Sequence, residues 1–167
     1  MFSEFYEGNQ AGPYPVYDEK DARFYYKNIG SSGALTDKLF EDAKYPTGFY
    51  LNSESDKKYI AAVKSGGKWG YIYFSTNESG KLVKKDGYFI DLKFDGAEPF
   101  YNGIAAVMKN DKYGFINTGG TFIIEPSYES AKYYNEGLIP VKTGGEWFYI
   151  DINQKRLLGP YEDAESF

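Results

Sequence analysis

The sequence predicts an all-β protein built from tandem repeats of about 34 to 44 residues, each holding two to three short antiparallel strands. Three observations predict this fold. Aromatic residues make up 20% of the 167 residues, and aromatic side chains favour the half-buried surface of a sheet. Nineteen Gly and seven Pro interrupt the chain too often for long helices. One segment also recurs along the chain, which is typical of repeat architectures.

The clearest recurrence joins residues 103–131 to residues 137–164. Matching positions lie 34 residues apart, as in Val107 and Val141. An earlier copy lies 44 residues before the first of these two, and a polar stretch at 75–87, predicted to be an extended hairpin or loop, accounts for its added length. A degenerate copy precedes it. We expect one repeat domain over residues 1–167, with approximate repeats at 5–45, 46–100, 101–134 and 135–167.

Short strands are predicted within each copy. In the last copy an apolar run at 138–142 is followed by Thr143-Gly144-Gly145-Glu146 and a second run at 147–152, a pattern that predicts an antiparallel hairpin. The segments 129–134 and 162–167 are predicted to form a helical turn. We expect the repeats to stack as an open, twisted array; the alternative is a closed, propeller-like ring.

Side-chain alternation gives the central strand two different faces. Trp69 and Tyr71 point to one face, while Gly70 points to the other. A glycine on a packed face allows a neighbouring backbone to approach closely. Phe148 occupies the position that Gly70 and Gly114 occupy in earlier copies. The last copy must therefore pack differently at this point.

Missing residue types exclude several classes of chemistry. The chain has neither Cys nor His, which removes thiolate catalysis, the Ser-His-Asp arrangement and the commonest metal ligand. We therefore expect that the protein is not an enzyme and that it holds neither a cofactor nor a metal ion. The net charge of −5 argues against a nucleic-acid partner. The sequence contains no apolar run long enough to span a membrane, and its composition favours a bacterial cell-surface or exported protein over a cytoplasmic one.

Two motifs make a family resemblance specific. Gly-Lys-Trp-Gly-Tyr-Ile at 67–72 and Asp-Lys-Tyr-Gly-Phe-Ile-Asn at 111–117 resemble the bacterial WG-repeat family, also called KWG. The fourth copy matches the pattern apart from Phe148, and the first copy barely matches it. The resemblance implies an all-β repeat module, often within larger bacterial proteins, and brings no catalytic residues with it.

The aromatic residues divide into recurring and variable positions. Trp69, Tyr113 and Trp147 share one repeat position, and we interpret such a recurring residue as core. Aromatics at variable positions are better candidates for a ligand or partner surface. These candidates are Tyr45, Tyr101 and Tyr133.

Carboxylates are plentiful, but their spacing selects no catalytic pair. Asp91, Asp95, Glu125 and Asp151 are interpreted as solvated strand ends or turn caps rather than a glycosidase acid and base. The sequence therefore predicts a non-catalytic binding or structural module with a protein partner. The alternative is a carbohydrate or cell-wall binding module that stacks sugar rings on aromatic side chains.

The core interpretation of Trp147 predicts a large effect on stability. Trp147→Ala should lower the free energy of unfolding by about 3–5 kcal/mol, because truncating a buried aromatic ring leaves a cavity. Denaturant melts of wild type and variant measure this difference. An unchanged midpoint would move Trp147 from the core to the surface.

Overall fold

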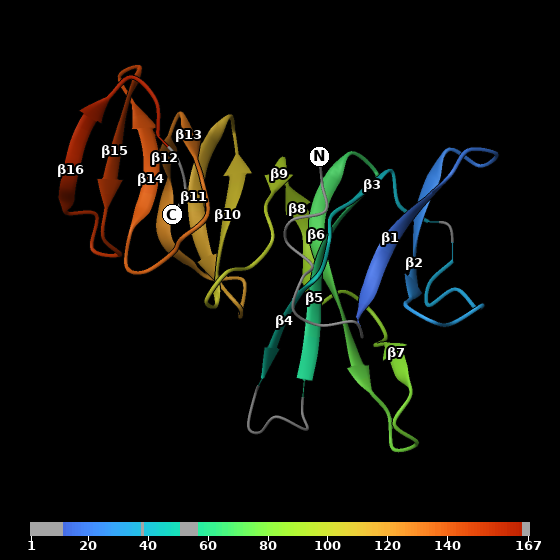
Figure 1. The fold of residues 1–167 in the computed structure, drawn as a ribbon. Helices are drawn as coiled ribbons and strands as arrows, with labels where there is room; N and C mark the ends of the chain where they lie inside the picture. Colours follow the sequence, from blue (N-terminus) through green and yellow to red (C-terminus); the bar gives the residue numbers. More distant parts are fainter. Residues whose placement is uncertain (1–11, 38, 51–56, 165–167) are drawn as a thin grey trace. The chain divides into compact units, whose positions relative to one another are not determined.

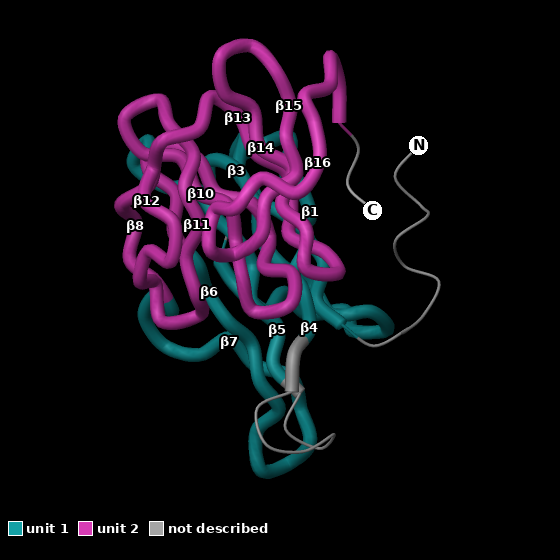
Figure 2. The backbone as a smooth tube through the Cα atoms, turned by 90° about the vertical axis from the view of Figure 1, so that its left-hand side faces the viewer, with its two compact units in different colours: residues 1–67, 71–89 teal, residues 68–70, 90–167 magenta. Residues whose placement is uncertain are grey.

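The structure is a computed structural model that describes residues 12–37, 39–50 and 57–164 (Figure 1). All regular secondary structure in these ranges is β-strand, as the sequence predicts. The chain divides into two compact units, residues 1–67 with 71–89 and residues 68–70 with 90–167 (Figure 2). The antiparallel sheets are small and open, since no sheet in the described ranges closes into a barrel or ring.

The first unit contains a two-stranded sheet and most of a six-stranded one. Strands β1 and β2 form the two-stranded sheet. In the six-stranded sheet, β3, β5, β6 and β7 are hydrogen-bonded neighbours in that order, and β4 also pairs with β5. The predicted extended hairpin is β6–β7, in which Thr76 pairs with Leu82. The strands are β1 (Pro13–Asp18), β2 (Arg23–Asn28), β3 (Asp42–Ala43), β4 (Thr47–Tyr50), β5 (Lys57–Ser65), β6 (Lys68–Thr76) and β7 (Leu82–Lys84).

The second unit contains two four-stranded sheets with the same order. Their strand orders are β12-β11-β10-β9 and β16-β15-β14-β13. The remaining strand, β8, pairs with β6, and the first three residues of β6 belong to this unit. The strands are β8 (Ile90–Phe94), β9 (Gly96–Ala97), β10 (Ile104–Lys109), β11 (Lys112–Asn117), β12 (Phe122–Tyr128), β13 (Ser130–Ala131), β14 (Ile139–Thr143), β15 (Glu146–Ile150) and β16 (Arg156–Tyr161).

A two-residue strand begins each of these sheets. An alanine from the segment before the hairpin pairs with the valine in the hairpin's first strand, and the same pairing occurs at β3–β5, β9–β10 and β13–β14. The pairs are Ala43 with Val63, Ala97 with Val107, and Ala131 with Val141. The helical turn predicted for 129–134 is therefore wrong, because this segment pairs in extended form with the next hairpin.

Each central hairpin turns through two residues with positive φ. Asn110 and Asp111 have φ values of 52° and 59°, and Gly144 and Gly145 have values of 61° and 79°. Two such residues between paired strands are typical of type I′ turns, whose twist matches that of the flanking strands. The β5–β6 turn has the same form at residues 66–67.

The motif glycines lie where another backbone crosses the sheet. A Cβ atom on Gly70 would be 2.6 Å from the carbonyl oxygen of Ile90, and one on Gly114 would be 2.6 Å from that of Ile124. No real Cβ atom tolerates such a distance. The prediction of close backbone approach at these glycines is confirmed.

The last copy reverses this arrangement. Phe148 fills the glycine position and is buried in the core, while Gly159 lies on the partner strand β16. A Cβ atom on Gly159 would be 2.9 Å from Cδ1 of the Phe148 ring. In the preceding copy the glycine lies on the central strand β11, whereas in the last copy it lies on the neighbouring strand β16 and the large residue lies on the central strand β15. The two strands of the last copy therefore still approach each other closely.

Each unit has its own hydrophobic core. In the first unit the Tyr26 ring packs against Phe40 and Phe74, with ring centroids 6.2 and 5.2 Å away. In the second unit one core joins the β9–β12 sheet to the β13–β16 sheet, which shows that the two copies stack. Its buried residues are Ala106, Phe115, Ile124, Ile139, Val141, Phe148 and Ile150.

The close approach at Gly114 predicts a strong effect of a single methyl group. Gly114→Ala should destabilise the fold by about 1–3 kcal/mol, since the added Cβ meets backbone atoms that cannot swing aside. Gly33→Ala is the matched control, because the nearest atom to its Cβ is 3.9 Å away. Equal denaturation midpoints for the two variants would contradict the packing described at Gly114.

Candidate binding surface

The recurring aromatic position lies in the core. Trp69 is 7% exposed and Trp147 is 8% exposed, and Tyr113 is half-buried. The ammonium group of Lys132 lies 5.2 Å from the centroid of the Trp147 ring. These rings present little surface to a ligand.

Two of the three predicted surface tyrosines lie together. The rings of Tyr101 and Tyr133 are 4.5 Å apart between centroids and inclined at 34°. Tyr101 precedes a tight turn through Asn102 and Gly103, and Tyr133 lies in the connection between β13 and β14. Tyr101 begins the copy at residues 101–134 and Tyr133 lies near its end, so the fold of this one copy brings the two rings together.

The surroundings of this pair raise one pKa. Burial raises the pKa of the Tyr101 hydroxyl above its ordinary value of 10.0, and the nearby Tyr133 and Glu98 add to the effect. Tyr101 therefore stays neutral and keeps its hydroxyl proton to a higher pH than a free tyrosine. The third candidate, Tyr45, is 48% exposed in the first unit, where it lies between β3 and β4.

The carboxylates singled out in the sequence do not gather into a centre. Asp151 accepts hydrogen bonds of 2.9 Å from the backbone of Asn153 and of Lys155 and so forms a turn cap. Asp91 and Glu125 are exposed. Across the described ranges no cluster of acidic side chains could hold a metal ion.

A second set of carboxylates holds the hairpin turns. In each case the carboxylate belongs to the segment before the hairpin and accepts hydrogen bonds from the turn amides. The bonds are Glu41 with Gly67 at 3.1 Å, Asp95 with Asn110 at 2.8 Å, and Glu129 with Gly144 at 2.7 Å and Gly145 at 3.2 Å. The sequence contained a signal for this role, because each carboxylate lies two residues before the alanine of its two-residue strand.

The same residues bond through their backbone. The amide of Glu129 donates to the carbonyl of Lys142 at 2.8 Å, next to the hairpin turn. Glu41 and Asp95 donate in the same way to Lys64 and Met108. One residue thus bonds both the strand and the tip of the hairpin that follows it.

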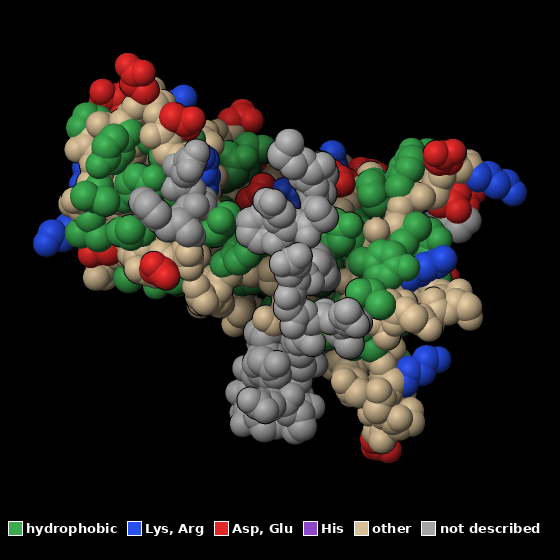
Figure 3. All heavy atoms as spheres, in the orientation of Figure 1, with side chains coloured by type: hydrophobic (Ala, Val, Ile, Leu, Met, Phe, Trp, Pro, Cys, Tyr) green, Lys and Arg blue, Asp and Glu red, His purple; other side chains and the backbone are tan. Residues whose placement is uncertain are grey.

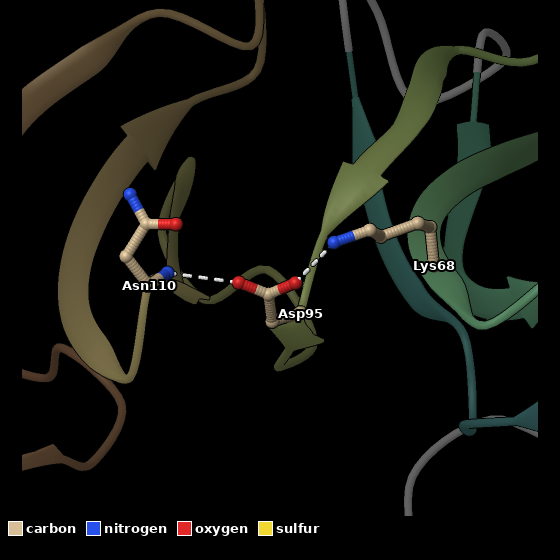
Figure 4. Close-up of polar contacts among 3 residues, drawn as sticks. All are labelled: Lys68, Asp95 and Asn110. Carbon is tan, nitrogen blue, oxygen red and sulfur yellow. Dashed lines mark hydrogen bonds and ion pairs between the residues drawn. The ribbon is translucent and has the colours of Figure 1, made fainter.

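Asp95 also joins two successive hairpins (Figure 4). One carboxylate oxygen forms an ion pair with Lys68, the lysine of the Gly-Lys-Trp-Gly motif, while the other accepts from the amide of Asn110. The hydrogen bond from Lys68 is the main cause that lowers the pKa of Asp95 below 3.8, and the Asn110 amide adds to it. A lowered pKa means that this carboxylate stabilises the fold above about pH 4 and that its contribution is lost as the pH falls through the lowered pKa.

Comparison with protein families supports the resemblance in the motifs. Residues 77–113 and 113–147 each match the model of the WG containing repeat. Residues 77–147 carry two adjacent WG-containing repeats. Within them, the motif glycine Gly114 lies at a backbone crossing.

The other two comparisons add no relative, since no curated protein and no solved structure matches the chain. Within the described ranges, no helical segment has the length and hydropathy needed to cross a lipid bilayer.

The turn-holding role of Glu129 predicts a measurable loss of stability. Glu129→Ala should lower the free energy of unfolding by about 1 kcal/mol, since two charge-assisted hydrogen bonds at an exposed site are lost. Glu125→Ala removes an exposed carboxylate four residues away and should change stability by less than about 0.5 kcal/mol. Paired urea melts test this, and equal losses in both variants would contradict the role.

Proposed function

We propose that this chain is a non-catalytic scaffold or protein-binding module, with Tyr101 and Tyr133 in its binding surface. The observation that carries the proposal is the contact between these two half-buried rings. They lie at positions that vary between copies, where repeat proteins place partner-specific residues. Tyrosine is also enriched at protein interfaces, because it combines a large apolar ring with a hydroxyl that can form a hydrogen bond.

The engagement of the carboxylates supports a non-catalytic role. A glycosidase needs two carboxyl groups that face each other across the substrate. Here Asp95 is bound to Lys68 and Asn110, and Asp151 is bound to its own turn. Both groups stabilise the backbone.

A carbohydrate module is the second candidate, and the same tyrosine pair is the observation that favours it. Sugar rings stack on exposed faces of aromatic side chains. Mutual contact at 4.5 Å covers one face of each ring and leaves less surface for a sugar. We therefore place a protein partner first. Tyr45, exposed in the first unit, stays a prediction as a further contact residue.

Affinity capture from envelope and cytosolic fractions of the source organism tests the proposal. Wild-type chain and the control Tyr88→Ala, which changes a tyrosine outside the pair that is 40% exposed, should retain the same protein. Tyr101→Ala and Tyr133→Ala should each lose it. Failure to retain any protein, combined with clear binding to a glycan array, would contradict the proposal and favour the carbohydrate module.

A further inference from the structure

The last strand of the second unit exposes an apolar surface. Leu157, Leu158 and Tyr161 on β16 are 43%, 46% and 44% exposed. A shallow groove of about 280 Å³ lies beside them and is lined by β16 residues and Phe148. In Figure 3, hydrophobic side chains gather over the part of this unit that holds β14 to β16.

The preceding copy shows what covers such a strand. Ile124 on β12 corresponds to Leu158 on β16. Ile124 pairs with Phe115, two residues after Tyr113, and Leu158 pairs with Tyr149, two residues after Trp147. Ile124 is only 1% exposed, since it packs in one core with Ile139 and Val141 of the next hairpin. The same position is therefore buried against a neighbouring hairpin on β12 and exposed on β16.

The carboxylate that holds such a hairpin is also present. Glu162 corresponds to Glu129, since both follow a tyrosine and lie two residues before an alanine. Glu129 accepts hydrogen bonds from the turn of the β14–β15 hairpin. Glu162 is exposed and accepts no hydrogen bond from any described residue. The apolar strand and the carboxylate thus repeat, side by side in sequence, the two features that bind β14–β15.

We propose that β16 and Glu162 bind a β-hairpin of a further WG-type repeat on a partner protein. This inference rests on the proposed protein-binding function and names its partner. The hairpin needs an apolar inner face for Leu158 and a two-residue turn with free amides for Glu162. A second copy of this chain fits poorly, because its three described turns of this kind are already held by Glu41, Asp95 and Glu129.

A cyclised peptide with the sequence of residues 138–150 supplies the hairpin in a binding titration against the full chain. Wild type and the control Glu125→Gln should bind it equally. Glu162→Gln should weaken binding about tenfold or more, as expected for hydrogen bonds to a charged group, and Leu158→Glu should abolish it. Both side chains are exposed, so thermal melts of the variants should match wild type.

A second peptide tests the turn contact itself. Replacing its first turn glycine, the counterpart of Gly144, with D-proline keeps the hairpin but removes the amide that Glu129 binds at 2.7 Å. The D-proline peptide should bind the wild-type chain as weakly as the first peptide binds the Glu162→Gln variant. The D-proline peptide should bind the Glu162→Gln variant with no further loss of affinity, because both changes remove the same contact.

The outcomes separate this inference from the function on which it rests. No peptide binding, or equal binding to wild type and Leu158→Glu, would overturn the inference. So would sedimentation that shows a dimer lost in Leu158→Glu, because the occupant would then be a second copy. If a captured protein still depends on Tyr101 and Tyr133, the proposed function stands without the hairpin; if only glycans are captured, the proposed function fails as well.

Discussion

At three places within residues 12–37, 39–50 and 57–164, a carboxylate side chain accepts hydrogen bonds from the turn of the hairpin that follows it. The backbone of the same residue bonds the strand that leads into that turn. Small sheets bury little apolar surface alone, and a hairpin by itself is only marginally stable. One residue before each hairpin therefore bonds both the first strand of the hairpin and its turn. These two bonds set the register in which the hairpin joins its sheet.

The other motif residues can be understood from this contact. The motif lysine, Lys68, bonds the carboxylate of Asp95, which holds the next turn. The aromatic residue beside it is buried, and the glycine after that allows a neighbouring backbone to cross. The alanine two residues after the carboxylate pairs with a valine in the hairpin. The motif therefore describes one joint between successive copies.

Much of this fold could be predicted from the sequence, because it rests on local signals. Apolar runs flanked by two-residue turns predicted the hairpins, and alternation along the central strand predicted the close approach at Gly114. The hydrogen bond between Glu129 and Gly144 joins residues 15 positions apart and produces no periodic pattern of apolar residues in the sequence. It was therefore not predicted from the sequence. The exchange of small and large residues between Phe148 and Gly159 also needed the paired strands, since the two lie on different strands.

The candidate surface was predicted only in part. Tyr101 and Tyr133 were selected because their positions vary between copies, yet their mutual contact depends on how the start and the end of one copy come together in the fold. The exposed face of β16 could not be foreseen, since Leu158 and Ile124 have similar side chains and differ only in what packs against them. Burial at such positions is decided by the neighbouring copy.

The most direct test of the central contact is a pH titration of backbone amide proton shifts by NMR, between about pH 2 and 6. The amide of Asn110 should shift with the ionisation of Asp95, the carboxylate that it binds. For Asn110 the midpoint should lie below 3.8, because the pKa of Asp95 is lowered. Amide shifts that stay constant over this range while the chain remains folded would contradict the account.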